Sequence, residues 1–196
     1  INGSKTVIKI ARQFMYPVIY EREIKMWNTN EFISKKGYIQ PFLFANRLKY
    51  INKLPDQLTD LEIIRGLSYS GQVRAYTAFD NTLMKRFIEK YKPTSIFDPC
   101  AGWGERLLTA ACYDIHYKGQ DINQKLEETY QKLITSYNLT NQSVTIVDSS
   151  TTQNKADCLF TCPPYFDTEI YTENGAENLS HNDFLKWWDT IIKNSD

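Results

Sequence analysis

The chain has 196 residues, of which 42% are apolar and 14% aromatic, and its formal net charge at pH 7 is zero. This composition suffices for a packed core and excludes a wholly disordered chain. No uninterrupted apolar run approaches the roughly 20 residues that a membrane-spanning helix needs, and no secretory leader precedes the first elements. We therefore expect a protein of the cytoplasm, or of a bacterial or phage-infected cell interior, without a membrane partner.

The N-terminal third differs from the rest in charge. Residues 1–65 carry 11 Lys and Arg against 6 Asp and Glu, whereas residues 66–196 carry 12 against 17. A basic arm beside an acidic body can hold nucleic-acid phosphates, and an ordinary solvated surface is the alternative. We divide the chain into an accessory region over residues 1–66, mainly helical with loops, and an α/β domain over residues 67–196.

Several elements are expected before the first glycine-rich turn. Weak alternation over residues 6–10 predicts a strand, and residues 21–27 and 42–54 have helical spacing. A capping-box signature at 59–62 predicts a helix that ends near Gly66. Apolar side chains then recur at four-residue steps, with Met84 and Ile88 beside them, and predict an amphipathic helix up to Pro93: Phe79, Leu83, Phe87 and Tyr91.

The stretch 94–106 organises the remainder of the chain. A short apolar strand ends at Asp98-Pro99, a small-residue turn covers Cys100, Ala101, Gly102, Trp103 and Gly104, and a helix begins at Glu105. Glycines between a strand and a helix let a ligand approach the backbone, next to the free N–H groups of the helix N-terminus. On its own this turn predicts only a nucleotide-like cofactor.

Three further strands follow, alternating with helical segments. They are expected at residues 116–120, 144–147 and 158–161, and they end in Asp121, in Asp148-Ser149 and in the turn Cys162-Pro163-Pro164-Tyr165. Strands that alternate with helices form parallel sheets, in which ligands bind at the carboxyl ends of the strands. We therefore predict an α/β, Rossmann-like parallel sheet with all four strand ends around one crevice.

The cysteines and histidines give no sign of a metal site. The four cysteines lack the paired spacing of zinc ligands, and the chain has only two histidines. We predict reduced, buried thiols and no bound metal.

Taken together, these residues resemble the class I S-adenosylmethionine-dependent methyltransferases that methylate exocyclic amino groups of DNA bases, as in restriction-modification. The resemblance runs from about Tyr69 to the end of the chain. It implies that S-adenosylmethionine is the cofactor, bound at its methionine end by Asp98, Pro99, Cys100, Ala101, Gly102 and Gly104. It further implies that Asp121 binds the ribose hydroxyls and that Asp148, followed by Ser149, lies near the adenine.

The resemblance assigns the catalytic loop to Cys162, Pro163, Pro164 and Tyr165. In this family an acceptor side chain and the next carbonyl bind both amine hydrogens, which frees the nitrogen lone pair for attack on the methyl group. Tyr165 offers a face for a base taken out of the stack. The family has Asp, Asn or Ser at the first loop position, and this chain has Cys162, whose thiol is a weak acceptor.

Four hypotheses follow from the resemblance. The leading one is a methyltransferase of double-stranded DNA acting on adenine N6 or cytosine N4, and the second is an RNA base methyltransferase of the same fold. In a third, Cys162 is the nucleophile of carbon-5 methylation. The fourth is a degenerate methyltransferase that binds without turnover.

The end of the chain carries two further expectations. The helix over residues 184–192, with a cap from Ser180 and Asp183, is expected to face the core. The family's sheet has three more strands, so we expect a C-terminal part beyond residue 196. Because residue 1 is Ile rather than Met, we also expect the chain to be a piece of a longer protein.

Overall fold

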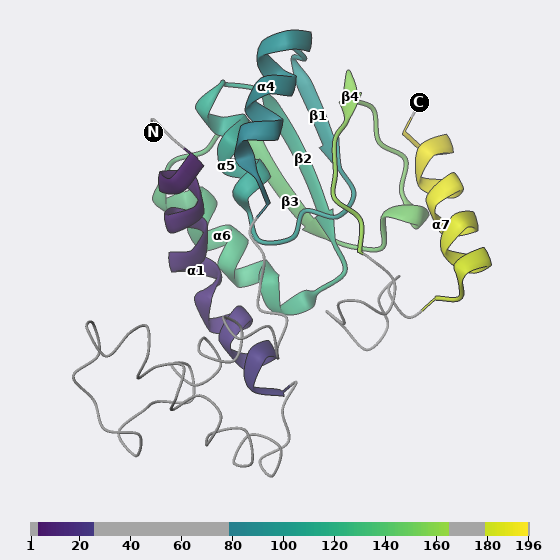
Figure 1. Cartoon of the computed structure of the whole chain (residues 1–196), viewed down its shortest axis with the longest axis horizontal. Coiled ribbons are helices and arrows are strands. Elements are labelled where there is room, and N and C mark those ends of the chain that lie inside the picture. Colours follow the sequence, from purple (N-terminus) through teal and green to yellow (C-terminus); the bar gives the residue numbers. More distant parts are fainter. Residues whose placement is uncertain (1–3, 26–78, 165–178, 196) are drawn as a thin grey trace, which may run out of the picture. The chain divides into compact units, whose positions relative to one another are not determined.

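The computed structural model describes residues 4–25, 79–164 and 179–195 (Figure 1). The chain divides into two compact units, one formed by residues 1–16 with 78–196 and the other by residues 17–77. The sheet belongs to the first unit. The helices predicted at 42–54 and 60–66 lie outside the described residues. In the part of the chain that is described, no helix has the length and hydrophobicity required to cross a membrane.

Four parallel strands form the sheet, in the order β3-β2-β1-β4. They are β1 (Ser95–Asp98), β2 (His116–Asp121), β3 (Gln142–Ile146) and β4 (Cys158–Leu159). Asp98 is in register with Gly119, and Asp121 with Ile146, so the strands end along the same edge. The predicted Rossmann-like parallel sheet is confirmed.

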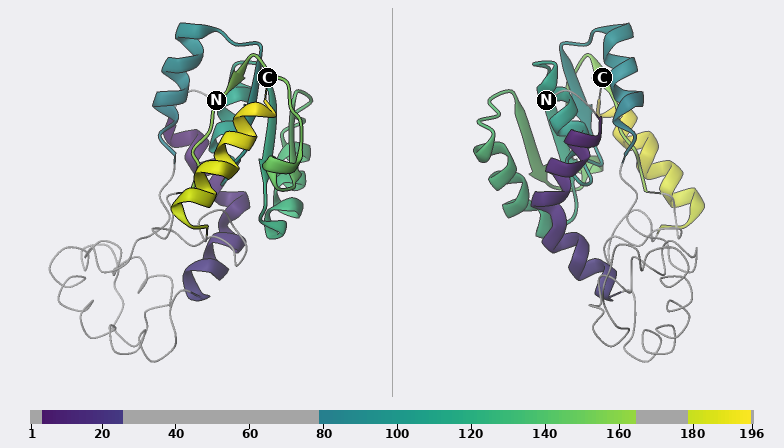
Figure 2. Two further views of the ribbon diagram at one scale, coloured as in Figure 1. Left: turned by 90° about the vertical axis from the view of Figure 1, so that its right-hand side faces the viewer. Right: turned by 60° about the vertical axis from the view of Figure 1, so that its left-hand side comes forward.

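Helices pack on this sheet in the expected alternation. From residue 79 onward the helices are, in chain order, α4 (Asn81–Tyr91), α5 (Glu105–Cys112), the 3-10 turn η2 (Gln124–Leu126), α6 (Glu127–Ser136), the 3-10 turn η3 (Ser149–Thr151) and α7 (His181–Lys193). The helix α5 contacts β2 and β3, α6 contacts β3, and α4 packs on α5. Figure 2 shows α4 beside the plane of the strands. The helix α7 contacts η3, and Figure 1 shows α7 on the β4 side of the sheet.

The strand predicted at residues 6–10 is wrong, because these residues lie in the helix α1 (Ser4–Lys25). Val7, Ala11 and Met15 are all buried, and their four-residue spacing places them on one helix face. The alternation over five residues was too short to outweigh this longer helical period.

The helix α4 forms where it was expected, and only part of its predicted apolar set is buried. Leu83 and Tyr91 are 57% and 60% exposed, whereas Met84 and Ile88 are buried together with Asn81. Steps of four residues drift around a 3.6-residue helix, so two neighbouring stripes fitted the sequence equally well. The tertiary contact with α5 selects the stripe of Met84 and Ile88.

The turn η2 precedes the helix α6, and Asn123 caps η2 by accepting a hydrogen bond from the amide of Lys125 at 3.2 Å. Leu126, Tyr130 and Leu133, which recur at three- and four-residue steps, are buried, and Tyr137 is 40% exposed. The helix α7 is capped by Ser180 as predicted. It buries Phe184 and Ile191, while Ile192 is 47% exposed.

Candidate functional site

The turn between β1 and α5 has the backbone conformation that its glycines permit. Gly102 has φ +64° and Gly104 has φ +85°, both in the left-handed region that other residues avoid. A Cβ at Gly104 would lie 3.2 Å from Met15 Cε and 3.3 Å from Leu133 Cδ2, so this glycine also allows α1 and α6 to pack on the turn. Trp103, between the two glycines, is buried.

Asp98 lies at the centre of a buried polar network beneath this turn. Its side chain is 0% exposed and pairs with Arg106, whose Nε lies 2.6 Å from Oδ2. The Tyr117 hydroxyl donates to the same Oδ2 at 2.5 Å. The other oxygen, Oδ1, accepts from the Thr161 hydroxyl at 2.6 Å and from the Cys100 amide at 3.2 Å.

Arg106 completes this network from the first turn of α5. Its guanidinium also donates to the Cys100 carbonyl and lies 5.0 Å from the centre of the Phe79 ring. Burial alone would lower the pKa of Arg106, but the Asp98 carboxylate raises it above its ordinary value. Arg106 therefore keeps its charge beside Asp98 inside the protein. Sequence reasoning missed this pair because a lone Arg in a helix is usually solvated.

Asp121 holds the turn from the end of the neighbouring strand. Its Oδ2 accepts from the Gly102 amide at 2.9 Å, and its Oδ1 accepts from the Asn123 amide at 2.9 Å. Burial raises the pKa of Asp121 to about 6, against the lowering effect of these two amides. Tyr130 donates to the Gly102 carbonyl at 2.5 Å, so both backbone polar groups of Gly102 are engaged.

The thiol of Cys100 is half-buried in the same turn. Burial raises its pKa well above the ordinary value, and the carboxylates of Asp98 and Asp121 raise it further. Cys100 is therefore a neutral thiol at physiological pH. None of the four cysteines forms a disulfide, as expected; Cys100, Cys158 and Cys162 are half-buried and Cys112 is exposed, so the expectation of buried thiols is wrong. Within the described segments no group of three or more His, Cys, Asp and Glu is placed to hold a metal ion.

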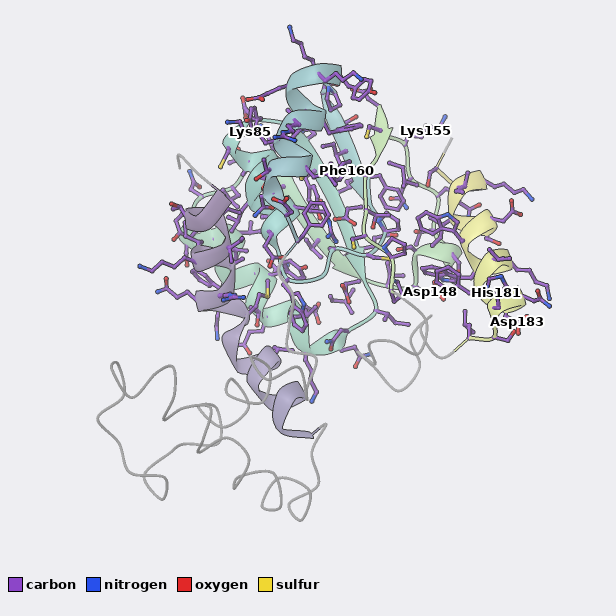
Figure 3. The ribbon with its side chains drawn as sticks, viewed as in Figure 1. Lys85, Asp148, Lys155, Phe160, His181 and Asp183 are labelled. Carbon is purple, nitrogen blue, oxygen red and sulfur yellow. The ribbon has the colours of Figure 1, made fainter. Side chains whose placement is uncertain are left out.

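The end of β3 contributes two residues with different partners. The Ser149 hydroxyl donates to the Pro99 carbonyl at 2.8 Å, so it supports the glycine turn. Asp148 caps η3 and accepts from the Trp187 Nε1 of α7 at 3.0 Å. Figure 3 shows Asp148 on the side of the sheet that faces α7.

The chain after β4 is anchored before it enters the expected catalytic loop. Phe160 donates its amide to the Phe97 carbonyl at 2.9 Å, and Thr161 then binds Asp98. Cys162, Pro163 and Pro164 follow, all half-buried. Tyr165 lies outside the described residues.

Most of the predicted site residues thus meet at one edge. Hydrogen bonds join Asp98, Pro99, Cys100, Gly102, Asp121 and Ser149 into a single cluster, which Thr161 links to the chain leading into Cys162. Asp148 is joined instead to α7. Arg106, Tyr117 and Thr161 were not singled out from the sequence. Arg106 and Thr161 flank the two turns, whereas Tyr117 lies within β2 and has no local signal of this role.

Comparison with known proteins finds similarity among solved structures. No protein-family model matches the chain, and no curated protein matches it. The chain is similar to the crystal structure of coclaurine N-methyltransferase bound to N-methylheliamine and SAH, with 13% sequence identity and a TM-score of 0.43. The match covers 98% of this chain and 60% of that chain. At this level the likeness identifies neither a substrate nor a cofactor of this chain.

Proposed function

We propose that this protein transfers a methyl group from S-adenosylmethionine to an exocyclic amino group of a DNA base, adenine N6 or cytosine N4. One observation carries the proposal. A single buried carboxylate, that of Asp98, holds the glycine turn through Cys100 and the start of the Pro-Pro loop through Thr161. The turn expected to bind the cofactor and the loop expected to bind the amine therefore share one anchor.

The residues of the turn fit the proposed cofactor. Gly104, the N-cap of α5, has no side chain with which to cap the helix. The positive end of a helix favours an anionic group such as the carboxylate of a methionine moiety. A Cβ at Gly102 would meet nothing closer than 3.5 Å, so the backbone there has room for a close ligand. Because the Asp98 carboxylate already has four partners, we propose that it binds the cofactor indirectly, by shaping the turn.

Two other aspartates supply the remaining contacts in this proposal. Asp121 is half-buried, and a carboxylate suits the two hydroxyls of a ribose. Asp148 and the backbone at Ser149 lie at the next strand end, where the adenine is expected. Ser149 uses its hydroxyl on Pro99, so we assign the Ser149 side chain to support of the turn.

When bound, the cofactor supplies an electrophilic methyl group. We propose that Cys162 and the carbonyl of Pro163 accept the two hydrogens of the target amine and hold its nitrogen lone pair toward that methyl group. The two prolines restrict the loop backbone, because their φ angles are fixed. A strong base is not required, since the amine proton is acidic once the nitrogen carries the methyl group. Tyr165 remains the residue predicted to stack on the base.

Calorimetry followed by a transfer assay tests the proposal. The protein is titrated with S-adenosylmethionine, and tritiated methyl transfer is then measured on unmethylated duplex DNA and on RNA. Asp121→Asn should weaken cofactor binding about 10- to 100-fold, because a hydrogen bond to a charged group contributes roughly 1.5–3 kcal/mol. Asp157→Asn is the matched control, since Asp157 binds Thr94 and Ser95 at the opposite edge of the sheet.

The products separate the competing hypotheses. Methylated amine in DNA supports the proposal, and transfer to RNA alone moves the substrate to RNA. A carbon-5 product would instead make Cys162 a nucleophile. Cofactor binding without transfer to either nucleic acid would identify a degenerate binding subunit and contradict the enzymatic proposal.

A further inference from the structure

We propose that the Thr161 hydroxyl is the positioning group that fixes the Cys162-Pro163-Pro164 loop over the glycine turn. This inference rests on the proposed function, because it gives that loop its task. Thr161 touches neither of the expected ligands in this role. It acts by holding the residues that do.

The first step of the argument is that strand pairing cannot hold this loop. The β1–β4 register ends at Phe97 opposite Leu159, and the Phe160 amide makes the next hydrogen bond, to Phe97. Pro163 and Pro164 have no N–H group, so they cannot extend a ladder of backbone hydrogen bonds. A side-chain anchor placed directly before the loop takes over where the strand stops, and Thr161 occupies this place.

The second step is that the partner of Thr161 is itself immobile. Asp98 is 0% exposed, and Arg106 and Tyr117 hold its Oδ2 at 2.6 and 2.5 Å. Rotation of the carboxylate would break an ion pair inside the protein, which is strongly unfavourable. The oxygen that Thr161 binds, Oδ1, therefore has a fixed position relative to α5 and β2.

The third step is that the same oxygen also defines the cofactor turn. Oδ1 accepts from the Cys100 amide at 3.2 Å and from the Thr161 hydroxyl at 2.6 Å. The Oδ1 atom thus joins the backbone of the glycine turn to Thr161, the residue directly before the loop. If Thr161 moved relative to this oxygen, the target amine bound by the loop would move relative to the methyl group of the cofactor.

The residue before Thr161 is anchored in a different direction. The Phe160 ring lies 4.9 Å from the ring of Phe87 and 5.9 Å from that of Phe79, and Figure 3 shows Phe160 next to α4. Consecutive side chains therefore bind α4 and Asp98, which fixes both the position and the direction of the chain as it enters Cys162.

The test compares variants at Thr161 in the full chain. Thr161→Val keeps the shape and removes the hydroxyl, so kcat for methyl transfer should fall by about 10- to 100-fold, as expected for a misplaced reacting group. The Kd for S-adenosylmethionine should stay within about threefold, because three partners of Asp98 remain. Thr161→Ser restores the hydroxyl and should recover most of kcat.

A matched control removes another threonine hydroxyl. Thr109 binds the Glu105 carbonyl at 2.8 Å and Asn81 at 3.0 Å, without contact to the loop. Thr109→Val should destabilise the fold but leave kcat within about threefold of wild type. An equal loss of kcat in both valine variants would assign the effect to general destabilisation and overturn the inference.

A second readout does not depend on activity. The rate of Cys162 alkylation by iodoacetamide, relative to the exposed Cys112, should rise several-fold in Thr161→Val and not in Thr161→Ser. If the valine variant fails to fold, the smaller Thr161→Ala replaces it. If wild type transfers no methyl group, the proposed function fails, and the alkylation rates alone decide the positioning role: equal rates would overturn it.

Discussion

The strand β1 ends at Asp98, and Asp148 follows the end of β3. Both aspartates lie at the same edge of the sheet, but their hydrogen-bond partners and burial differ. Asp98 is fully buried, and its partners include the guanidinium of Arg106. Asp148 is half-buried, and its Oδ1 accepts from neutral donors, the Ser150 amide at 3.0 Å, the Ser150 hydroxyl at 2.8 Å and the Trp187 indole at 3.0 Å.

This difference separates two kinds of acid that look alike in the sequence. Asp98 forms a buried ion pair with Arg106 and also holds the glycine turn and the start of the Pro-Pro loop. Arg106 balances the charge of Asp98 without a ligand. Asp148, in contrast, is half-buried and has only uncharged donors among the described residues, through which it caps η3 and joins it to α7. A carboxylate of the second kind is the one suited to contact a ligand directly.

Among the changes that test this difference, removal of the Arg106 charge should reduce the free energy of unfolding the most. Arg106→Met leaves Asp98 as a buried carboxylate without its counter-ion and should lower the free energy of unfolding by about 3–5 kcal/mol. Urea unfolding followed by circular dichroism measures the change.

The matched control is Lys193→Met, because Lys193 pairs with Asp189 on the exposed face of α7 at 2.5 Å. An exposed pair of this kind contributes about 0.5 kcal/mol or less. Similar losses in the two variants would contradict the view that Asp98 and Arg106 form an ion pair essential to the fold.

The features predictable from the sequence were those encoded within a few residues. Glycines after Asp98, a cap at Ser180 and the alternation of short apolar runs with helical segments gave the parallel sheet and placed the acids at one edge. Each of these patterns has a direct local cause, so it survives in the folded chain.

The features that were missed depend on contacts between distant segments. Nothing local to Arg106 indicates that its charge is buried, because its partner Asp98 must first be brought under α5. The same holds for Thr161, which meets Asp98 across 63 positions of sequence. The exposed face of α4 is a third case, since packing against α5 decides between two stripes with the same period.

The second prediction concerns Glu105, the residue before Arg106, which is 1% exposed at the start of α5. Burial raises the pKa of Glu105 to about 7 from an ordinary value of 4.5. The folded state therefore holds a proton that the unfolded chain releases, so stability decreases as the pH rises from about 4.5 to about 7. Glu105→Gln should remove this decrease and raise the free energy of unfolding at pH 8 by up to about 3 kcal/mol.

Unfolding midpoints of wild type and Glu105→Gln between pH 5 and pH 8 check this expectation. The two proteins should converge in stability toward pH 5 and separate toward pH 8. Glu127→Gln is the control, because Glu127 is exposed in the first turn of α6. A constant difference between wild type and Glu105→Gln across this range would show that Glu105 does not titrate on unfolding as inferred.

The smallest change in the free energy of unfolding is expected when Asp148 loses its hydrogen bond from Trp187. Trp187→Phe keeps an aromatic ring on α7 and removes the indole N–H that Asp148 accepts, so the free energy of unfolding should fall by about 1 kcal/mol, as for a partly exposed hydrogen bond. Trp188→Phe makes the same change on the neighbouring half-buried residue and should cost less. Urea unfolding of both variants, alone and combined with Asp148→Asn, measures the coupling between Trp187 and Asp148. A Trp187 loss of 3 kcal/mol or more, comparable to that of Arg106, would contradict the distinction between the two aspartates, because Asp148 would then be as deeply built into the fold as Asp98.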